Sequence, residues 1–145
     1  FGQKDITSGS FATMGAAIPM AIGASCYDKD AQIIVVTGDG SLELNIQELK
    51  TVSQNNLNIK IFVINNGGYA SIRESQDEYS EGRYTEDEDI LDFSKVANAF
   101  EMNYEIIDDY LTIDEQINKV TSNSNPTLIE VVCERDQKIF GPEVI

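Results

Sequence analysis

The sequence contains no histidine, and its 145 residues include only two cysteines, Cys26 and Cys133. Without histidine, a Ser-His-Asp or Cys-His catalytic triad is impossible within this chain. The two cysteines are far apart and form no C-x-x-C pair, which argues against a zinc site or an iron–sulfur cluster. Both lie in apolar stretches, so we expect buried free thiols and, with them, a reducing cytoplasmic location.

Basic residues are also scarce: 10 Lys and Arg stand against 25 Asp and Glu, for a net charge of -15. This balance argues against binding to nucleic acid and to anionic membrane surfaces. No apolar run reaches the ~18 residues of a membrane-spanning helix, and the start is not a signal peptide. The chain has one domain's length, and without an initiator Met we expect residues 1–145 to be a domain cut from a longer protein.

The acidic residues are not spread evenly, because nine of them lie between Glu74 and Asp92. Such a run is typical of a solvated loop. The alternative is a lid or a segment that docks a partner.

Apolar β-branched runs alternate with helical patterns, which predicts an α/β fold with a mainly parallel sheet in a three-layer sandwich. We expect strands at 32–37, 59–65, 104–107 and 127–133, and helices at 13–24, 43–54, 70–74, 93–100 and from Thr112 onward. The strand at 32–37 is continuously apolar and is therefore expected at the centre of the sheet. Thr13 is the expected cap of the first helix, and Thr112 with Glu115 resembles a capping box.

Two Gly-rich turns follow neighbouring predicted strands and precede predicted helices. The first is 38–41, Gly-Asp-Gly-Ser, and the second is 65–69, Asn-Asn-Gly-Gly-Tyr. In open α/β sheets, ligands bind at the carboxyl ends of the strands. The two turns are therefore the candidate ligand site of this chain.

The chemistry of these turns suits a Mg-diphosphate. Asp39 is a hard oxygen ligand, Asn66 offers a neutral oxygen, and the flexible glycines after it can turn a backbone carbonyl inward. The free N–H groups of helices that begin at 40–41 and 69–71 attract phosphate. Neither G-x-G-x-x-G nor G-K-[ST] is present, so this is not a dinucleotide or P-loop fingerprint.

Gly38-Asp39-Gly40, followed by 24 residues and then Asn65-Asn66, resembles the motif of the thiamine-diphosphate enzymes that include acetolactate synthase and pyruvate decarboxylase. The resemblance covers nearly the whole chain and implies the thiamine-diphosphate-binding fold, with thiamine diphosphate and Mg²⁺ as cofactors. It implies Mg²⁺ ligands from the side chains of Asp39 and Asn66 and from the Gly68 carbonyl. The residues it places around the diphosphate are Gly38, Gly40, Ser41, Tyr69, Ala70 and Ser71.

Upstream, residues 6–15 (Ile-Thr-Ser-Gly-Ser-Phe-Ala-Thr-Met-Gly) are similar to the acetolactate-synthase branch. By that resemblance, Met14 wedges beneath the bent cofactor. The loop of Ala12, Thr13 and Met14 contacts the pyrimidine, through the Ala12 carbonyl and the Met14 amide. The alternative for Met14 is an ordinary core methionine.

The resemblance implies an acetolactate synthase-like enzyme that decarboxylates a small 2-oxo acid and transfers the resulting carbanion. The activating glutamate belongs to a separate pyrimidine-binding domain from a neighbouring subunit. No catalytic residue is therefore expected here, the isolated domain should be inactive, and the protein should be a homodimer or homotetramer. The alternatives are the β half of a two-subunit 2-oxo acid decarboxylase and a non-catalytic Mg-diphosphate-binding or interaction module.

The chain departs from the branch after Asn66, where Gly67-Gly68-Tyr69 stands in place of Glu-Gln-Gly. This difference concerns the substrate pocket. Arg73, in the same segment, either reaches a carboxylate or phosphate of the substrate or balances the acidic run.

Overall fold

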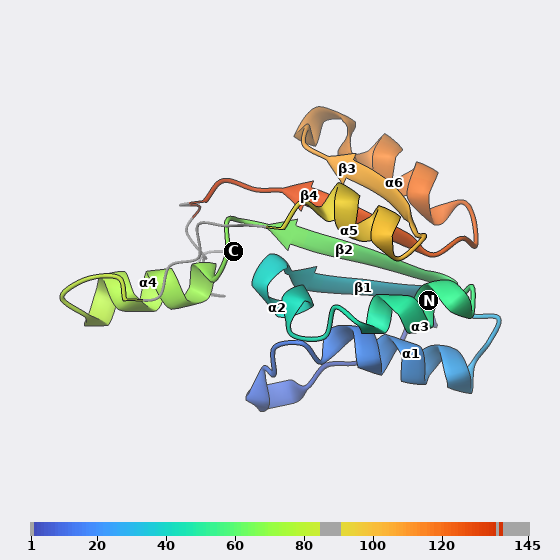
Figure 1. Ribbon diagram of the computed structural model, residues 1–145, viewed down its shortest axis with the longest axis horizontal. Helices are drawn as coiled ribbons and strands as arrows, with labels where there is room; N and C mark the ends of the chain where they lie inside the picture. The colour runs from blue at the N-terminus through green and yellow to red at the C-terminus, as the bar shows by residue number, and fades with distance from the viewer. Residues whose placement is uncertain (1, 85–90, 136, 138–145) are drawn as a thin grey trace.

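The centre of the molecule is a sheet of four parallel strands, seen in a computed structural model that describes residues 2–84, 91–135 and 137 (Figure 1). In chain order the strands are β1 (Ile33–Gly38), β2 (Ile59–Asn65), β3 (Asn103–Ile107) and β4 (Thr127–Val132). They lie side by side in the order β1-β2-β4-β3, and every neighbouring pair is parallel. This sheet, with helices in its connections, confirms the predicted α/β fold class.

Helices cover both faces of the sheet. The described helices are η1 (Gly9–Phe11), α1 (Ala17–Tyr27), α2 (Asp39–Glu43), α3 (Glu48–Gln54), α4 (Ala70–Tyr79), α5 (Phe93–Ala99), η2 (Tyr110–Thr112) and α6 (Ile113–Thr121). Helices α1, α3 and α5 share one core with Ile61 and Val63 of β2, whereas Phe62 packs with Val120 of α6. Because successive strand side chains alternate between faces, these clusters lie on opposite sides and make the predicted three layers. Within residues 2–84, 91–135 and 137, no helix is long and apolar enough to cross a membrane.

Strand β1 lies at one end of the described sheet, so the prediction of a central strand at 32–37 is wrong. Its burial alternates: Val35 is buried, whereas Ile34 and Val36 are 49% and 65% exposed. Periodicity could not reveal this exposure, because a continuous apolar run is typical of a strand covered on both faces.

Helix α1 begins later than predicted, and Thr13 does not cap it. The chain takes φ +78° at Gly15, in the left-handed region, and that angle separates Thr13 from the helix that starts at Ala17. Ala16 precedes the helix without a side-chain cap. Pro19 is the third helical residue, where its missing N–H leaves no helical hydrogen bond unmade.

The helix predicted at 43–54 is two helices, because the chain tightens into turns between α2 and α3. The Asn45 amide donates to the Leu42 carbonyl at 3.2 Å, and the Glu48 amide donates to the Asn45 carbonyl at 3.0 Å. The side chain of Asn45 is also engaged, since its Nδ2 donates to the Gly15 carbonyl at 2.8 Å. Asparagine side chains that bond to backbone in this way compete with helix continuation.

Helix α4 is longer than the predicted helix at 70–74, so the acidic run starts on a helix. Asp77 of this helix pairs with Arg83 at 2.6 Å, and this hydrogen bond lowers the pKa of Asp77. The rest of the predicted acidic loop includes 85–90, which lie outside the described residues.

Two smaller expectations were wrong. Thr112 precedes α6 but does not cap it, because its hydroxyl donates to the Asp109 carbonyl. Asp109 caps the preceding helix, η2, and its side chain accepts from the Leu111 amide at 2.9 Å. The two cysteines are free but not buried: Cys26, near the end of α1, is exposed, and Cys133, just after β4, is partly buried.

Lys60 of β2 is fully buried, and its ammonium donates to Asn123 Oδ1 at 3.1 Å and to the Asn125 carbonyl. Burial lowers the pKa of Lys60 in the folded state from its ordinary value of 10.5. At pH values between the folded and the unfolded pKa, the unfolded state therefore binds more protons than the folded state. We therefore expect the free energy of unfolding to rise with pH across that window. Denaturant titrations at several pH values would measure this slope. Lys60→Met, the control, should have a smaller slope, and equal slopes would contradict the prediction.

Candidate functional site

The two predicted turns meet at the carboxyl end of the sheet. Gly38, the last residue of β1, pairs with Ile64 of β2, so Asp39 and Asn66 leave neighbouring strands at nearly the same level. Figure 1 shows α2 and α4 at this end of the sheet, with α4 extending away from it. The structure therefore brings together the turns that the sequence places 24 residues apart.

Asp39 is buried at the centre of this site, with only 2% of its surface exposed. Its Oδ1 accepts from the Gly40 amide at 2.8 Å, and its Oδ2 accepts from the amides of Asn66 at 3.1 Å and Gly68 at 2.8 Å. One carboxylate therefore links the start of α2 to the loop after β2. An ionised carboxylate has about four acceptor positions, so three donors leave room for one further contact.

The loop 65–68 has hydrogen-bond partners for its other backbone groups as well. The Asn65 carbonyl accepts from the Cys133 amide, the Gly67 amide donates to Asn65 Oδ1, and the Gly68 carbonyl accepts from the Ala70 amide at 2.7 Å. Gly67 and Gly68 have φ of +79° and +91°, which other residues rarely adopt. This explains why the turn contains two consecutive glycines.

Arg73 makes contacts that neither alternative considered from the sequence includes, although its charge also helps to lower the pKa of Asp77 in the acidic run. Its guanidinium is buried and donates to the carbonyls of Asn66 at 2.8 Å, Gly67 at 2.8 Å and Arg135 at 2.7 Å. The guanidinium of Arg73 is therefore a hydrogen-bond donor to the loop, and it does not project toward solvent.

The loop that contains Met14 is attached to the same site. The Gly15 amide donates to Ser41 Oγ at 2.9 Å, next to the start of α2, and the Gly15 carbonyl accepts from Asn45. Met14 itself is 38% exposed, which does not fit the alternative of an ordinary core methionine. Ala12 and Thr13 are exposed too, so this loop presents an open surface beside the turn.

The pattern of residues did not point to Glu130, which supports the loop from β4. Its carboxylate accepts from Asn65 Nδ2 at 2.7 Å and from the Tyr104 hydroxyl at 2.5 Å. Burial and the neighbouring Glu130 carboxylate raise the pKa of Tyr104, so the hydroxyl keeps its proton and remains a donor. The available signal was a lone acid inside an otherwise apolar predicted strand.

The oxygen atoms at this site suit a hard cation. The Asn66 side chain makes no hydrogen bond to another described residue, and the Gly68 carbonyl, which accepts from Ala70, keeps a second lone pair. In the part of the chain that the structure describes, no three His, Cys, Asp or Glu side chains are grouped to hold a metal. A cation here would therefore rely on one carboxylate and neutral oxygens, as Mg²⁺ does when phosphate completes its shell.

The amides predicted for the diphosphate are only partly available. Those of Gly40 and Ala70 already donate within the chain, to Asp39 and to the Gly68 carbonyl. Ser41 and Ser71 lie in the first turns of α2 and α4, where N–H groups lack helical partners. The ring of Tyr69, from the second turn, packs against Gly40 of the first turn, and this contact joins the two turns.

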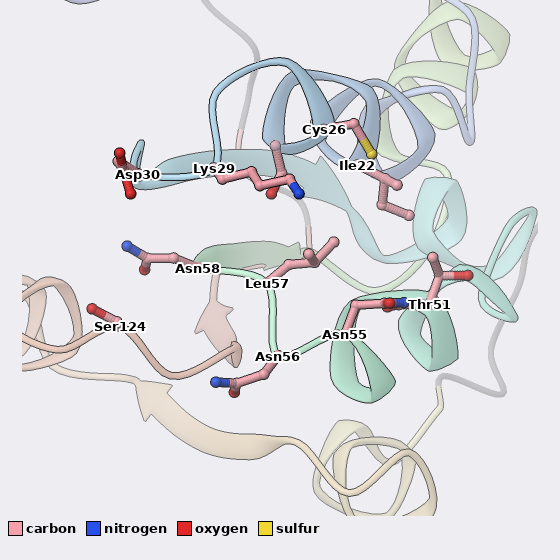
Figure 2. Close-up of a pocket in the computed structure, with 11 residues that line it drawn as sticks. Ile22, Cys26, Lys29, Asp30, Thr51, Asn55, Asn56, Leu57, Asn58 and Ser124 are labelled. Atoms are coloured by element: carbon pink, nitrogen blue, oxygen red, sulfur yellow. The ribbon is translucent and has the colours of Figure 1, made fainter.

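A surface hollow of about 620 Å³ lies at the opposite end of the sheet (Figure 2). Its walls include Lys29, which comes just before β1, and Leu57 and Asn58, which come just before β2. A second hollow of about 480 Å³ borders the predicted site, because its lining includes Ala70, Arg73 and Arg135. The site at Asp39 is thus not inside either hollow, although the second one adjoins it.

The fold is that of an open α/β domain with parallel strands, a class in which ligands bind beyond the carboxyl ends of the strands. The sequence model of the family described as "Thiamine pyrophosphate enzyme, C-terminal TPP binding domain" matches residues 2–131. The chain belongs to this family, and thiamine pyrophosphate, also called thiamine diphosphate, is its cofactor. The predictions of family, fold class and this cofactor are confirmed.

Curated relatives are acetolactate synthases. The chain is 32% identical over 131 residues to the mitochondrial acetolactate synthase catalytic subunit of Aspergillus candidus, covering 90% of this chain and 19% of that protein. It is 29% identical over 137 residues to the large subunit of acetolactate synthase isozyme 1 of Escherichia coli K12, covering 93% of this chain and 24% of that protein. The chain thus spans about a fifth to a quarter of the length of these relatives.

Proposed function

We propose that this chain is the cofactor domain of a longer, acetolactate synthase-like enzyme that decarboxylates a small 2-oxo acid and transfers the remaining fragment. The family match and the acetolactate synthase relatives support this activity. The observation that carries the proposal is the buried Asp39 carboxylate, which holds the loop of Asn66 and Gly68 beside the start of α2.

In this proposal the domain holds the diphosphate end of the cofactor through Mg²⁺. Asp39 and Asn66 would contribute side-chain oxygens and Gly68 its carbonyl, in agreement with the free acceptor positions at these three residues. Ser41 and Ser71 would donate to the diphosphate. Gly38, Gly40, Tyr69 and Ala70 would shape the surrounding backbone.

The loop of Ala12, Thr13 and Met14 would hold the pyrimidine half of the cofactor. The Gly15 hydrogen bonds to Ser41 and Asn45 support this role, because they fix the loop beside the diphosphate residues. When bound, thiamine diphosphate supplies the carbon that attacks the 2-oxo group and the ring that accepts its electrons. This chain would contribute binding, orientation and exclusion of water.

The catalytic glutamate would come from a pyrimidine-binding domain of a neighbouring subunit, in a homodimer or homotetramer. The exposed surface at Met14 supports such a partner, because it leaves the proposed pyrimidine loop open on this chain. The free cysteines Cys26 and Cys133 support a cytoplasmic location.

The complete protein should consume a 2-oxo acid such as pyruvate only when thiamine diphosphate and Mg²⁺ are both present. Removing the metal with a chelator should abolish turnover, and adding Mg²⁺ should restore it. The 145-residue chain alone should show no turnover under the same conditions, because the proposed glutamate lies on another domain. An assay that follows loss of the 2-oxo acid and release of CO₂ measures turnover by the chelated protein, by the protein with Mg²⁺ restored, and by the separate chain.

Two results would contradict parts of this proposal. Turnover by the separate chain would show that the partner domain is not required. Mg²⁺-dependent binding of the cofactor by the complete protein, without turnover of any 2-oxo acid, would favour a non-catalytic binding module.

A further inference from the structure

The loop 66–68 is held from two sides by side chains of opposite charge. Asp39 accepts from the amides of Asn66 and Gly68, while Arg73 donates to the carbonyls of Asn66 and Gly67. Asp39 and Arg73 are each only 2% exposed. Four backbone groups of one short loop therefore depend on two buried ionic side chains.

A buried guanidinium is costly unless hydrogen bonds compensate for its lost hydration. Among the residues that the structure describes, Arg73 forms no ion pair, and its hydrogen-bond partners are three backbone carbonyls. An apolar side chain in its place would leave these carbonyls without their donor, so Arg73 supports the stability of the loop. It also sets the geometry of the loop, because its planar fork fixes the direction of each carbonyl it binds.

A second arginine extends this arrangement. Arg135, which follows β4, donates to the Gly67 carbonyl at 3.0 Å, and its own carbonyl accepts from Arg73. A Cβ atom on Gly67 would lie 3.1 Å from the Arg135 side chain, so the loop and this side chain are in close contact. The Gly67 carbonyl is thus held by two guanidinium groups, whereas it is the neighbouring Gly68 carbonyl that we assign to the metal.

We propose that Arg73 is a positioning residue for Mg²⁺. By binding the carbonyls of Asn66 and Gly67, it determines the loop conformation in which the Gly68 carbonyl and the Asn66 side chain are left for the metal. This inference rests on the proposed function, because it assigns a role toward the Mg²⁺ that the proposed function invokes. Arg73 does not itself touch the metal or the substrate.

The test compares Mg²⁺ with Ca²⁺. Mg²⁺ demands a near-ideal octahedron with short bonds, whereas Ca²⁺ accepts longer and less regular ones. A loosened loop should therefore lose more affinity for Mg²⁺ than for Ca²⁺, and a general loss of stability should not change their ratio. Arg73→Lys keeps the charge but not the fork, and Arg73→Met removes both.

In the complete protein, we expect Arg73→Lys and Arg73→Met to weaken Mg²⁺ binding about 10- to 100-fold at saturating thiamine diphosphate. Ca²⁺ binding should weaken less, so the preference for Mg²⁺ should fall. Calorimetric titration with each metal gives both constants, and the thermal midpoint without cofactor reports stability separately. Arg83→Met is the matched control, because Arg83 pairs with Asp77 beyond the loop and should leave both metal constants unchanged.

The outcomes separate this inference from the proposed function. If the wild-type protein does not bind thiamine diphosphate with Mg²⁺, the proposed function fails. If the wild-type protein binds and Arg73→Lys keeps the wild-type ratio of the two metal constants, only the role of Arg73 is overturned. Should neither Arg73 variant fold, Arg135→Met is decisive, because it removes one of the two donors to Gly67. For Arg135→Met, a fall in the preference for Mg²⁺ over Ca²⁺ that is smaller than the fall expected for the Arg73 variants supports the inference. An unchanged preference overturns it.

Discussion

Replacing Asp39 with alanine in the complete protein is expected to abolish Mg²⁺-dependent binding of thiamine diphosphate. The substitution removes the one charged oxygen ligand that we assign to the metal. It also leaves the amides of Gly40, Asn66 and Gly68 without their acceptor. A buried donor without a partner costs about 1–3 kcal/mol, so the loop should also lose its conformation.

Calorimetric titration with thiamine diphosphate in excess Mg²⁺ measures this effect. Asp30→Ala is a suitable control, because Asp30 is an exposed acid that borders the hollow at the other end of the sheet. It changes the net charge equally and should leave the titration as in the wild type. A titration of Asp39→Ala that matches the wild type would show that Asp39 is not a metal ligand.

The second large effect is expected for Gly40→Ala. Helix propensity alone predicts that alanine in α2 would stabilise the protein by up to about 1 kcal/mol. The added Cβ atom would, however, lie 2.6 Å from Cε1 and 2.9 Å from Cδ1 of the Tyr69 ring. Overpacking of this kind costs about 1–3 kcal/mol, so we expect a net loss of stability. Because Tyr69 adjoins Gly68, cofactor affinity should fall as well.

A double-mutant cycle tests the cause of this effect. With Tyr69→Ala in the background, Gly40→Ala should cost little, because the ring that opposes the new methyl group is gone. Gly23→Ala is the matched control, since Gly23 lies within α1 and a Cβ atom there would meet nothing within 4 Å. Thermal or denaturant unfolding gives the stabilities. Additive costs for Gly40 and Tyr69 would contradict the steric explanation.

Local sequence patterns predicted much of this fold. Strand β2 has the predicted bounds, Ile59–Asn65, because a β-branched run between polar turns has few alternatives. Helix α5 begins at Phe93 as predicted, and Asp92 caps it by accepting from the Lys95 amide. The placement of β1 at the end of the described sheet was not predictable, because exposure depends on which segments pack over a strand and periodicity does not report that.

For the site, the sequence predicted which residue types come together but not how they are held. Gly15, Asn45 and Ser41 connect distant segments through hydrogen bonds between side chains and backbone that leave no periodic signal. Arg73 looked like a solvent-facing or substrate-facing charge, because a lone arginine near an acidic run usually is one. The metal and cofactor contacts of Asp39, Asn66 and Gly68 remain predictions.

The position of β1 has a practical consequence for experiments on the chain by itself. Along its outer side, its backbone groups are not paired with any strand among the described residues, and Ile34 and Val36 are exposed on one face. An apolar strand with an open border is a template for adding strands from other molecules, which leads to aggregation. The separate chain is therefore expected to self-associate along this edge, and a charged side chain in place of Val36 should reduce that association.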